Sequence, residues 1–387
     1  MIKNRDDERS KRKILYITGT RADYGLMKSV LRKIDKHPKL ELAIVVTGMH
    51  LMDEFGLTIK EIKKDGFKNY EIDALYEKDS KESMANFIGK FIQLLTKKVK
   101  EIKPDIILLL GDRGEMLAGA IVGAYLTILV AHLHGGEITS TVDEFSRHAI
   151  TKLAHIHFSA TENSAERIIK MGEDPSNVFV VGAPGLDSIL NENLIEPMKL
   201  SEKYNLDISK PILLVAQHPV TTEVEDAPDQ IRETLETISE LKHQTVLIYP
   251  NADAGGRRMI EVIKKYPFIK AFKSIPHKEY LSLMKMASVL TGNSSSGIIE
   301  APSFGLPVVN IGSRQEGRER AENVIDVDYN KEQIKAAIKK ALYDEDFKEK
   351  VKNCKNPYGD GKAGVRIADV LNKIKIDKKL LQKKLTY

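Results

Sequence analysis

The sequence predicts an α/β protein built from two doubly wound halves that face a central crevice. Short apolar runs of strand length alternate with amphipathic segments of helix length along most of the chain, which is typical of parallel sheets covered by helices. The pattern occurs twice, because a polar, partly helical segment at residues 186–210 separates two series of strands. Polar and charged residues directly follow several apolar runs, and open parallel sheets place their ligands at that end of the strands.

Four parts follow from this pattern. Residues 1–12 are a charged extension, residues 13–185 form an N-terminal Rossmann-like domain, and residues 186–365 form a C-terminal Rossmann-like domain. Residues 366–387 form a last helix and a Lys-rich tail, which we expect to be solvated. No tandem repeat of short period and no low-complexity segment interrupts this order.

The composition is that of a soluble globular protein. Of its 387 residues, 42% are hydrophobic and 30% are charged, and the net charge is only +5. Much of that positive excess lies in the C-terminal tail, so we expect no nucleic-acid partner. The single cysteine, Cys354, excludes an internal disulfide and a cysteine-based metal cluster. The N-terminus is charged and has no apolar signal segment, so we expect a cytoplasmic protein without a membrane partner.

Ionisable residues are concentrated between residues 105 and 159. The stretch begins with the apolar run IILLL, which is too short to span a membrane and too apolar for a solvent-facing strand. It therefore predicts a strand buried on both faces, with Asp112 just after its carboxyl end. The next strand, ILVAHLH, ends with His132 and His134, and the glycines at 135 and 136 allow a close turn.

A helix follows this turn. The residues Thr141 to Glu144 have the form of a capping box and predict where the helix begins. Asp143 and Arg147 are four residues apart, as are Glu144 and His148, so each pair shares a face of the helix. We expect these two carboxylates and two basic groups to point toward one crevice.

Plainer interpretations of these residues stay open. Asp143 and Arg147 could form no more than a helix ion pair worth about 0.3–0.5 kcal/mol, and Asp112 could cap a helix. Five of the ten histidines lie between residues 132 and 157, and clustered histidines are one mark of a metal site. The spacing contains no His-Glu-x-x-His motif and no cysteine ligand, so we expect no metal and assign structural roles to His155 and His157.

The first predicted strand, KILYITG, leads into a turn at residues 19–25 and then an amphipathic helix. This unit lacks the Gly-x-Gly-x-x-Gly fingerprint, which disfavours a nicotinamide or flavin dinucleotide, and no other cofactor is expected. Arg21 stands at the predicted N-terminus of the helix. It could hold a phosphate there, although an arginine in this place is commonly just solvated.

The second half also has polar residues at its strand ends. The sequences QHP, NAD and TGNSSSG close three predicted strands, and the last leads into the segment IIEAPSFG, which we expect to be helical. Small hydroxyl residues at a helix N-terminus can hold an anion through backbone N–H groups and hydroxyls. Glu300, in the first turns of that helix, is suited to accept hydrogen bonds from ribose hydroxyls. Arg314 directly follows the next strand, whereas Arg318 and Arg320 are equally well explained as solvated.

Several motifs, in this order, resemble those of one enzyme family. They are GTRADYG, GDRGE, HLHGGEITSTVDEFSRHAITKLAHIHFSAT, GNSSSGIIEAPSFGLPVVNIGSRQEGR and NPYGDGKA. Over nearly all of its length after the N-terminal extension, the chain resembles the hydrolysing UDP-N-acetylglucosamine 2-epimerases of the sialic-acid pathway. The resemblance implies the two-domain GT-B fold and conversion of UDP-N-acetylglucosamine to N-acetylmannosamine and UDP through 2-acetamidoglucal. Relatives act on the 2,4-diacetamido-trideoxy sugar nucleotide of legionaminic acid synthesis, which is the alternative substrate.

The resemblance also implies site residues and partners. Asp112 and Asp143 match catalytic carboxylates, His218 matches a histidine for proton transfer or leaving-group stabilisation, and Arg147 matches a helix arginine. The implied substrate contacts are Arg21, Arg113, Ser294, Ser295, Glu300 and Arg314. Asn251 and Ser296, which follow predicted strands, are expected to contact the substrate as well. The partner is a UDP-sugar, and related enzymes form homodimers or homotetramers.

This chain departs from the family pattern at one position. Where many members have a third catalytic glutamate in His-x-Glu-Gly-Gly, this chain has His134. Either His134 itself or Glu137 could replace that carboxylate, since a histidine can exchange protons near neutral pH.

Three rival functions stay open. A GT-B glycosyltransferase would use the same nucleotide crevice, but the retained Asp112 and Asp143 argue against it. A nucleotide-sugar-binding regulator without catalysis is favoured only by the departure at His134. The non-hydrolysing branch of the family would release a UDP-sugar; the turn Arg-Ala-Asp-Tyr-Gly in place of Arg-Pro-Glu favours hydrolysis.

Overall fold

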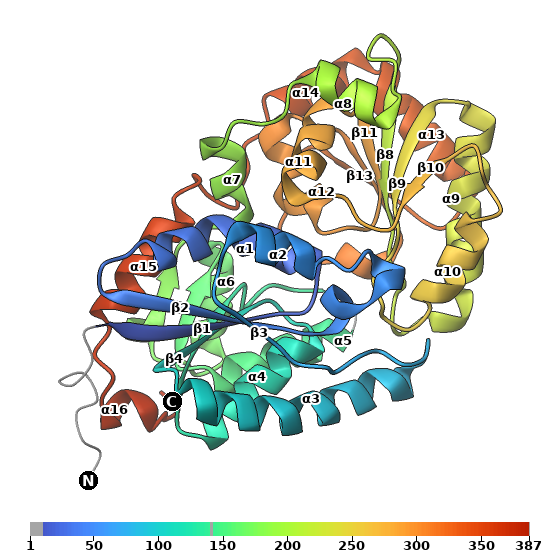
Figure 1. The fold of residues 1–387 in the computed structure, drawn as a ribbon. Helices are drawn as coiled ribbons and strands as arrows, with labels where there is room; N and C mark the ends of the chain where they lie inside the picture. The colour runs from blue at the N-terminus through green and yellow to red at the C-terminus, as the bar shows by residue number, and fades with distance from the viewer. Residues whose placement is uncertain (1–10, 140–141, 387) are drawn as a thin grey trace.

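Two parallel sheets, each covered by helices on both faces, form the two halves of the protein (Figure 1). The computed structural model describes residues 11–139 and 142–386. The first sheet has seven strands in the order β3-β2-β1-β4-β5-β6-β7, all parallel. They are β1 (Arg12–Thr18), β2 (Leu40–Val46), β3 (Asn69–Glu71), β4 (Ile106–Leu110), β5 (Leu129–Leu133), β6 (Ile156–Ser159) and β7 (Val178–Val180).

Alternate residues of the central strands enter two separate cores. In β4, Leu108 packs with α1 (Arg21–Asp35), α2 (Ile59–Asp65) and α15 (Ala363–Lys373), whereas Leu109 packs with the other set of helices. That set is α3 (Lys81–Ile102), α4 (Gly114–Tyr125) and α5 (Val142–Leu153). All five residues of β4 are buried, which confirms the prediction of a strand covered on both faces. The remaining helix of this half, α6 (Glu162–Lys170), lies beside β6 and β7.

The second sheet repeats the arrangement with six parallel strands in the order β10-β9-β8-β11-β12-β13. They are β8 (Ile212–Ala216), β9 (Gln244–Ile248), β10 (Lys270–Phe272), β11 (Val289–Gly292), β12 (Val308–Ile311) and β13 (Val324–Val327). One face is covered by α9 (Ala227–Leu241), α10 (Gly256–Ile263) and α13 (Lys331–Tyr343), the other by α8 (Pro197–Tyr204) and α11 (His277–Met286). The prediction of two doubly wound halves is confirmed.

The short edge strands β3 and β13 were not predicted. Both are exposed in part and carry polar residues, so neither has the apolar run that marks the central strands. The four-part division of the chain remains a proposal. The first sheet draws its strands from residues 12–180 and the second from residues 212–327. The link between them contains α7 (Gly185–Asn191) and α8.

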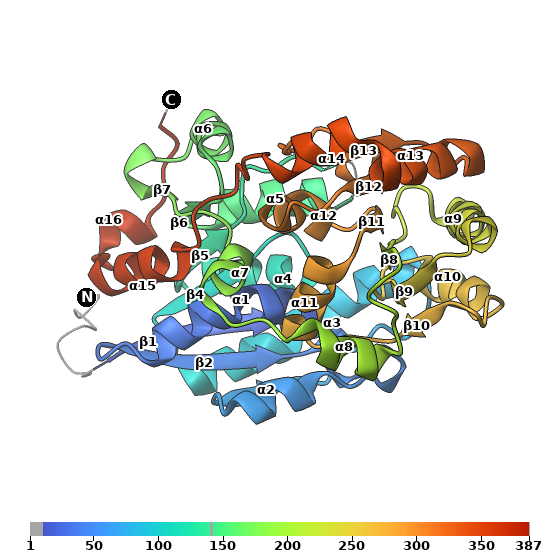
Figure 2. The same cartoon turned by 90° about the horizontal axis from the view of Figure 1, so that it is seen from above.

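The C-terminal segment returns to the first half, where α15 lies beside α1 in both views (Figures 1 and 2). The short helix α16 (Lys378–Leu381) follows, and Leu380 and Leu381 pack against the first core. Lys383 donates hydrogen bonds to three carbonyls at the end of α5, of which the shortest is 2.7 Å long, to Ala154. The prediction that this tail is solvated is therefore wrong for these residues, because apolar side chains interleaved with the lysines give the segment a face that can dock.

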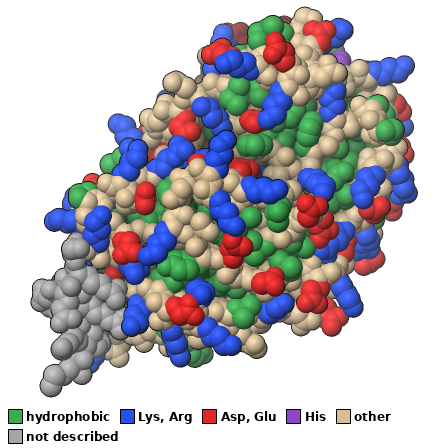
Figure 3. Space-filling view, in the orientation of Figure 1, with side chains coloured by type: hydrophobic (Ala, Val, Ile, Leu, Met, Phe, Trp, Pro, Cys, Tyr) green, Lys and Arg blue, Asp and Glu red, His purple; other side chains and the backbone are tan. Residues whose placement is uncertain are grey.

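The order of the strands reverses at two places, between β1 and β4 in the first sheet and between β8 and β11 in the second. Such switch points leave a crevice outside the carboxyl ends of the strands. On the face shown in Figure 3, positive and negative side chains are interspersed over the surface. Within the described ranges, no helix combines the length and the apolar character that crossing a membrane requires.

Candidate active site

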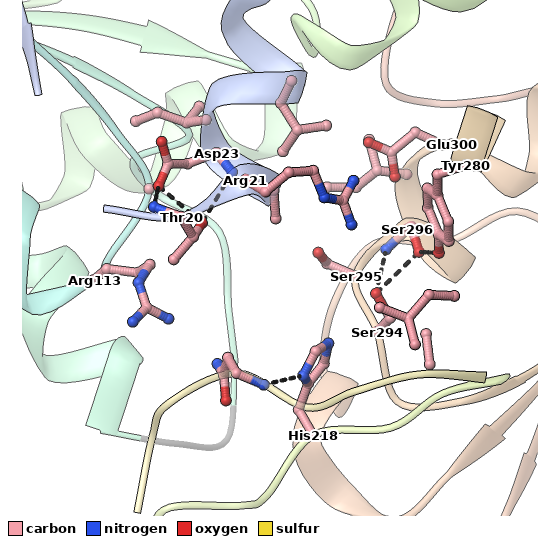
Figure 4. A pocket seen from close by; sticks show the side chains of 18 of the residues that line it. Thr20, Arg21, Asp23, Arg113, His218, Tyr280, Ser294, Ser295, Ser296 and Glu300 are labelled. Carbon is pink, nitrogen blue, oxygen red and sulfur yellow. Dashed lines mark hydrogen bonds between the residues drawn. The ribbon is translucent and has the colours of Figure 1, made fainter. Parts of the chain in front are cut away.

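A crevice between the two halves collects side chains from both switch points (Figure 4). The first half contributes the loops after β1, β4 and β5 together with α5, and the second half contributes the loops after β8, β9, β11 and β12. Every predicted site residue except Glu137 lines this crevice: Arg21, Asp112, Arg113, His134, Asp143, Arg147, His218, Asn251, Ser294, Ser295, Ser296, Glu300 and Arg314. The roles assigned to these residues remain predictions.

Arg147 stands at the centre of the first half of the crevice. Its side chain is almost fully buried, and its guanidinium contacts the carboxylate of Asp112 and donates a 2.8 Å hydrogen bond to the carbonyl of Glu137. Asp112 does not cap a helix, because the N-cap position of α4 is Arg113. The ion pair therefore ties α5 to the end of β4 and holds a carboxylate at the crevice.

Of the residues predicted to form pairs on α5, Asp143 lines the crevice, whereas Glu144 and His148 lie outside it. Asp143 lines the crevice and lies 3.9 Å from Arg314 of the other half. Glu144 does pair with His148, at 2.8 Å, but neither residue lines the crevice, so the prediction that both point into it is wrong. Successive helix positions are rotated by about 100°, which turns Glu144 away from the direction of Asp143. The predicted cap, Thr141, lies outside the described residues.

His134 and Glu137 are in contact but face different ways. The imidazole of His134 lines the crevice, and its Nδ1 is hydrogen-bonded to Oε1 of Glu137. The second carboxylate oxygen of Glu137 contacts Arg318, and Glu137 itself does not line the crevice. Burial alone raises the pKa of Glu137, but the charge of Arg318 and the hydrogen bonds from His134 and Arg318 outweigh it and lower this pKa to about 2. Glu137 is therefore an ionised support for His134.

The other histidines of this stretch are engaged in structural contacts. His132 is buried, and its Nε2 donates a 2.7 Å hydrogen bond to the carbonyl of Gly111. His155 accepts a hydrogen bond from the backbone of Val130 at 3.1 Å, and His157 contacts Glu173 at 3.1 Å. Across residues 11–139 and 142–386, no group of histidine, cysteine, aspartate or glutamate side chains is placed to hold a metal ion.

Arg21 extends from the start of α1 toward the other half (Figure 4). A capping box between Thr20 and Asp23 fixes this start. Among the described residues, Arg21 has no carboxylate within ion-pair distance, and its guanidinium lies 5.4 Å from the centre of the Tyr280 ring. Burial lowers the pKa of Arg21, and nearby Tyr280 and Glu61 only partly offset this effect. A buried cation in this position is suited to bind an anion.

The serine turn faces Arg21 across the crevice (Figure 4). Ser294 and Ser296 share a hydrogen bond of 2.9 Å, and the hydroxyl of Tyr280 lies 2.6 Å from Ser296. The helix predicted here is a single turn, α12 (Ser296–Ile299), followed by a short 3-10 turn, so its dipole is small. Hydroxyl groups thus provide most of the anion-binding capacity of this loop. Tyr280 was not predicted, since no sequence signal marks a tyrosine within a helix.

His218 has a defined tautomer. Its Nδ1 accepts a 3.2 Å hydrogen bond from the backbone N–H of Asn251, so in the neutral ring the proton is on Nε2. Burial, reinforced by the charges of Arg314, Arg113 and Arg21, lowers the pKa of His218 well below its usual value. His218 therefore offers a neutral N–H donor to the crevice, surrounded by three arginines.

Arg113 and Glu300 occupy opposite sides of the crevice. Arg113 lies 3.3 Å from both Glu115 and Asp253, so two carboxylates already balance its charge. Glu300 is buried, and burial raises its pKa to about 7. Gly185 lies close to this carboxylate, since a Cβ at that position would be 2.7 Å from Oε1 of Glu300. A larger residue at 185 would therefore displace the Glu300 carboxylate.

Two Rossmann-like halves that enclose such a crevice define a protein of the GT-B fold, one of several classes that bind sugar nucleotides. A comparison with protein families is more specific. The chain belongs to the UDP-N-acetylglucosamine 2-epimerase family, whose model matches residues 32–372.

Individual relatives agree with this assignment. A UDP-N,N'-diacetylbacillosamine 2-epimerase (hydrolyzing) from Legionella pneumophila is 44% identical over 96% of this chain and 98% of its own length. A UDP-N-acetylglucosamine 2-epimerase from Neisseria meningitidis is 39% identical over 85% of this chain and 87% of its own length. The fold matches the crystal structure of UDP-GlcNAc 2-epimerase from Neisseria meningitidis bound to UDP-GlcNAc. The TM-score is 0.80 and the sequence identity 21%, and the match covers 94% of this chain and 100% of the other. The protein is a UDP-sugar 2-epimerase.

Proposed function

We propose that this UDP-sugar 2-epimerase is a hydrolysing one, which releases UDP and a free manno-configured 2-acetamido sugar. The observation that carries the proposal is the Legionella relative, which is 44% identical over almost the full length of both chains and is named as a hydrolysing enzyme. The crevice supports it, because it combines anion-binding groups on one side with two carboxylates on the other.

The same relative bears on the substrate. Its identity of 44% exceeds the 39% of the Neisseria enzyme named for UDP-N-acetylglucosamine. We therefore place the UDP-2,4-diacetamido-2,4,6-trideoxy sugar first and UDP-N-acetylglucosamine second, in the reverse of the order that the motifs suggested. Both substrates undergo the same bond changes at C1 and C2.

Departure of UDP must lead the reaction. The C2 hydrogen of the sugar is not adjacent to a carbonyl, so it becomes acidic only as the bond from C1 to the UDP oxygen breaks and the ring becomes oxocarbenium-like. Arg21, Arg314 and the serine turn stabilise the charge that develops on the diphosphate. The neutral Nε2–H of His218 donates to the same leaving group, which is the role its tautomer supports.

The carboxylates act on the sugar ring. Asp112, paired with Arg147, stabilises the positive charge near C1. Asp143, which lines the crevice, exchanges a proton on one face of C2. Loss of the C2 proton gives an enzyme-bound 2-acetamidoglucal beside UDP; water then adds at C1 while a proton returns to the other face of C2. Glu300 and Asn251 contact the nucleoside.

Proton NMR in deuterium oxide tests this proposal. The purified protein is incubated in parallel with UDP-N-acetylglucosamine and with its 2,4-diacetamido-trideoxy analogue. We expect release of UDP together with a free manno-configured sugar that carries deuterium at C2, and the faster substrate identifies the sugar. A UDP-linked manno product would instead assign the chain to the non-hydrolysing branch. If UDP binds but neither sugar nucleotide exchanges its C2 hydrogen, the enzymatic proposal fails.

A further inference from the structure

An ion pair joins the two halves at the edge of the crevice, where Arg318 is a lining residue and Glu137 is not. Glu137 follows β5 of the first sheet, Arg318 follows β12 of the second, and the guanidinium of Arg318 contacts Oε2 of Glu137. Both side chains are nearly excluded from solvent, with exposed fractions of 2% for Glu137 and 8% for Arg318. The alternative that left Arg318 solvated is therefore wrong. A buried ion pair of this kind is costly unless further contacts satisfy both partners.

Further contacts do hold the pair in place. Arg318 also donates a 2.9 Å hydrogen bond to the side chain of Gln315, which in turn donates to the carbonyl of Asn293 at 2.9 Å. The backbone carbonyl of Glu137 accepts a 2.8 Å hydrogen bond from Arg147. Glu137 is thus fixed from its own half by Arg147 and from the other half by Arg318.

The first oxygen of Glu137 orients His134. Because Nδ1 of the imidazole donates to this carboxylate, the Nε2 atom is left as the acceptor of the neutral ring. His134 has a φ of 60°, a left-handed conformation that is unusual for a residue with a side chain. This conformation is held at the edge of the crevice, which His134 lines.

We propose that His134 is the base that removes the C2 proton, and that Arg318 is a positioning residue from the opposite half that completes the His134–Glu137 pair. The proposal rests on the proposed function and adds to it the identity of the base and the residues that support it. It resolves the choice between His134 and Glu137 in favour of the histidine.

Removal of the C2 proton needs no reactant other than the sugar nucleotide and His134. The lone pair of Nε2 forms a bond to the C2 hydrogen, and the electron pair of the C2–H bond becomes the second bond between C1 and C2. The electron pair of the C1–O bond leaves with UDP. The ring of His134 is then an imidazolium whose Nδ1–H remains hydrogen-bonded to Glu137, so the new charge is paired as it forms. Solvent takes this proton at the end of the cycle.

Arg318 partly neutralises the negative charge of the Glu137 carboxylate. Without Arg318, the full negative charge of Glu137 would bind a proton on the His134 imidazole more tightly, and a histidine that is already protonated cannot act as a base. The other charged or titratable groups around the pair come from α5, α6, β5, the end of α12, the loop after β12 and the loop before α15. They are Arg147, Arg167, His132, Glu300, Arg314 and Tyr358. None of them contacts the Glu137 carboxylate as Arg318 does.

Kinetics of His134→Gln, Glu137→Gln and Arg318→Met test the proposal. UDP release from the preferred sugar nucleotide is measured against pH, and hydration of 2-acetamidoglucal in the presence of UDP is measured separately. We expect His134→Gln to lower kcat for UDP release by about 10²- to 10⁴-fold, with glycal hydration affected far less and UDP binding unchanged.

The pH profile separates positioning from a structural role. We expect Arg318→Met to lower kcat by about 100-fold and to move the acidic limb of kcat/KM to higher pH by roughly one unit. Glu137→Gln should move the same limb to lower pH. Arg318→Lys keeps the positive charge but loses the planar guanidinium. It should return the acidic limb of kcat/KM to its wild-type pH without restoring the full kcat. A purely structural role would lower the rate equally at every pH.

Matched variants guard against misfolding. Arg232→Met removes an arginine that pairs with Asp229 at the surface of α9, away from the crevice, and it should keep kcat and the pH profile within about twofold. If Arg318→Met does not fold, the double variant Glu137→Gln/Arg318→Met removes both buried charges and should show the profile of Glu137→Gln alone.

Either of two results overturns the inference. One is an acidic limb that stays in place in every soluble Arg318 variant, and the other is a His134→Gln protein that still releases UDP at the wild-type rate. Failure of the proposed function is distinguishable from both, because the wild-type protein itself would then release no UDP from either substrate.

Discussion

Arg147 and Asp112 join the helix that carries Asp143 to the carboxyl end of the central strand β4. The guanidinium is almost fully buried, whereas a fifth of the Asp112 side chain is exposed at the crevice, so the pair presents its negative side to the ligand. A carboxylate held in this way has a fixed position. It is suited to stabilise positive charge on a sugar ring.

The first prediction concerns the two ends of strand β4. We expect Asp112→Asn to lower kcat by about 10²- to 10⁴-fold, with UDP affinity nearly unchanged, because the amide cannot stabilise the cationic ring. Asp105→Asn is the matched control. Asp105 precedes the same strand and accepts a 2.8 Å hydrogen bond from the backbone of Lys13, far from the crevice. Its replacement should lower the melting temperature but leave kcat intact; equal kcat losses in both variants would contradict the assignment.

The second prediction compares neighbours on α5. Asp143→Asn should reduce turnover by about 10²-fold or more because Asp143 lines the crevice, and isothermal titration should show UDP binding close to that of the wild type. Glu144→Gln changes the next residue, which pairs with His148 outside the crevice. This control should keep kcat within a few-fold. Normal turnover by Asp143→Asn would rule out its proposed role.

The third prediction is the pH dependence of stability that Glu300 causes. Burial raises the pKa of Glu300 from 4.5 to about 7, so the folded protein retains a proton that the unfolded chain loses. The ligand-free protein should therefore lose stability as the pH rises from about 4.5 through 7. In scanning calorimetry, Glu300→Gln should raise the melting temperature relative to the wild type more at pH 8 than at pH 5. The same variant should bind UDP more weakly, since it cannot accept ribose hydrogen bonds as a carboxylate.

The fourth prediction concerns the C-terminal segment. Lys383 donates to the last carbonyls of α5 and pairs with the buried Glu173. Lys383→Met should destabilise the protein by about 2 kcal/mol, which calorimetry detects as a drop of a few degrees in the melting temperature. Lys384→Met alters the adjacent, exposed lysine and should have little effect. Identical melting temperatures for the two variants would show that the observed contacts contribute nothing.

The fold could be predicted largely from local patterns. Strands such as β1, β4 and β8 are buried on both faces, so each appears in the sequence as a continuous apolar run. The edge strands β3 and β13 were missed because their exposed sides carry polar residues. The helix predicted after the serine turn shrinks to one turn, α12, since proline at 302 and glycine at 305 interrupt it.

The site could be predicted in part for a related reason. In parallel sheets all carboxyl ends lie at one edge, so residues that follow apolar runs, such as Asp112, His218 and Arg314, must gather there whatever their separation in the chain. Tyr280 lies within α11, not at a strand end, and reaches the crevice only because that helix covers the second sheet. No local signal identifies such a residue.

The sequence by itself determined the α/β class, the two halves and most of the charged residues that line the crevice, because periodicity and strand-end position are local properties of the chain. Only the tertiary structure decided which charges pair across the halves. It separated His134, which faces the crevice, from Glu137, which supports it, and it brought Arg318 and Lys383 to partners about 180 and 210 residues away. Pairing over such distances depends on how two sheets dock, and docking reflects the shape and burial of whole surfaces, which no short stretch of sequence encodes.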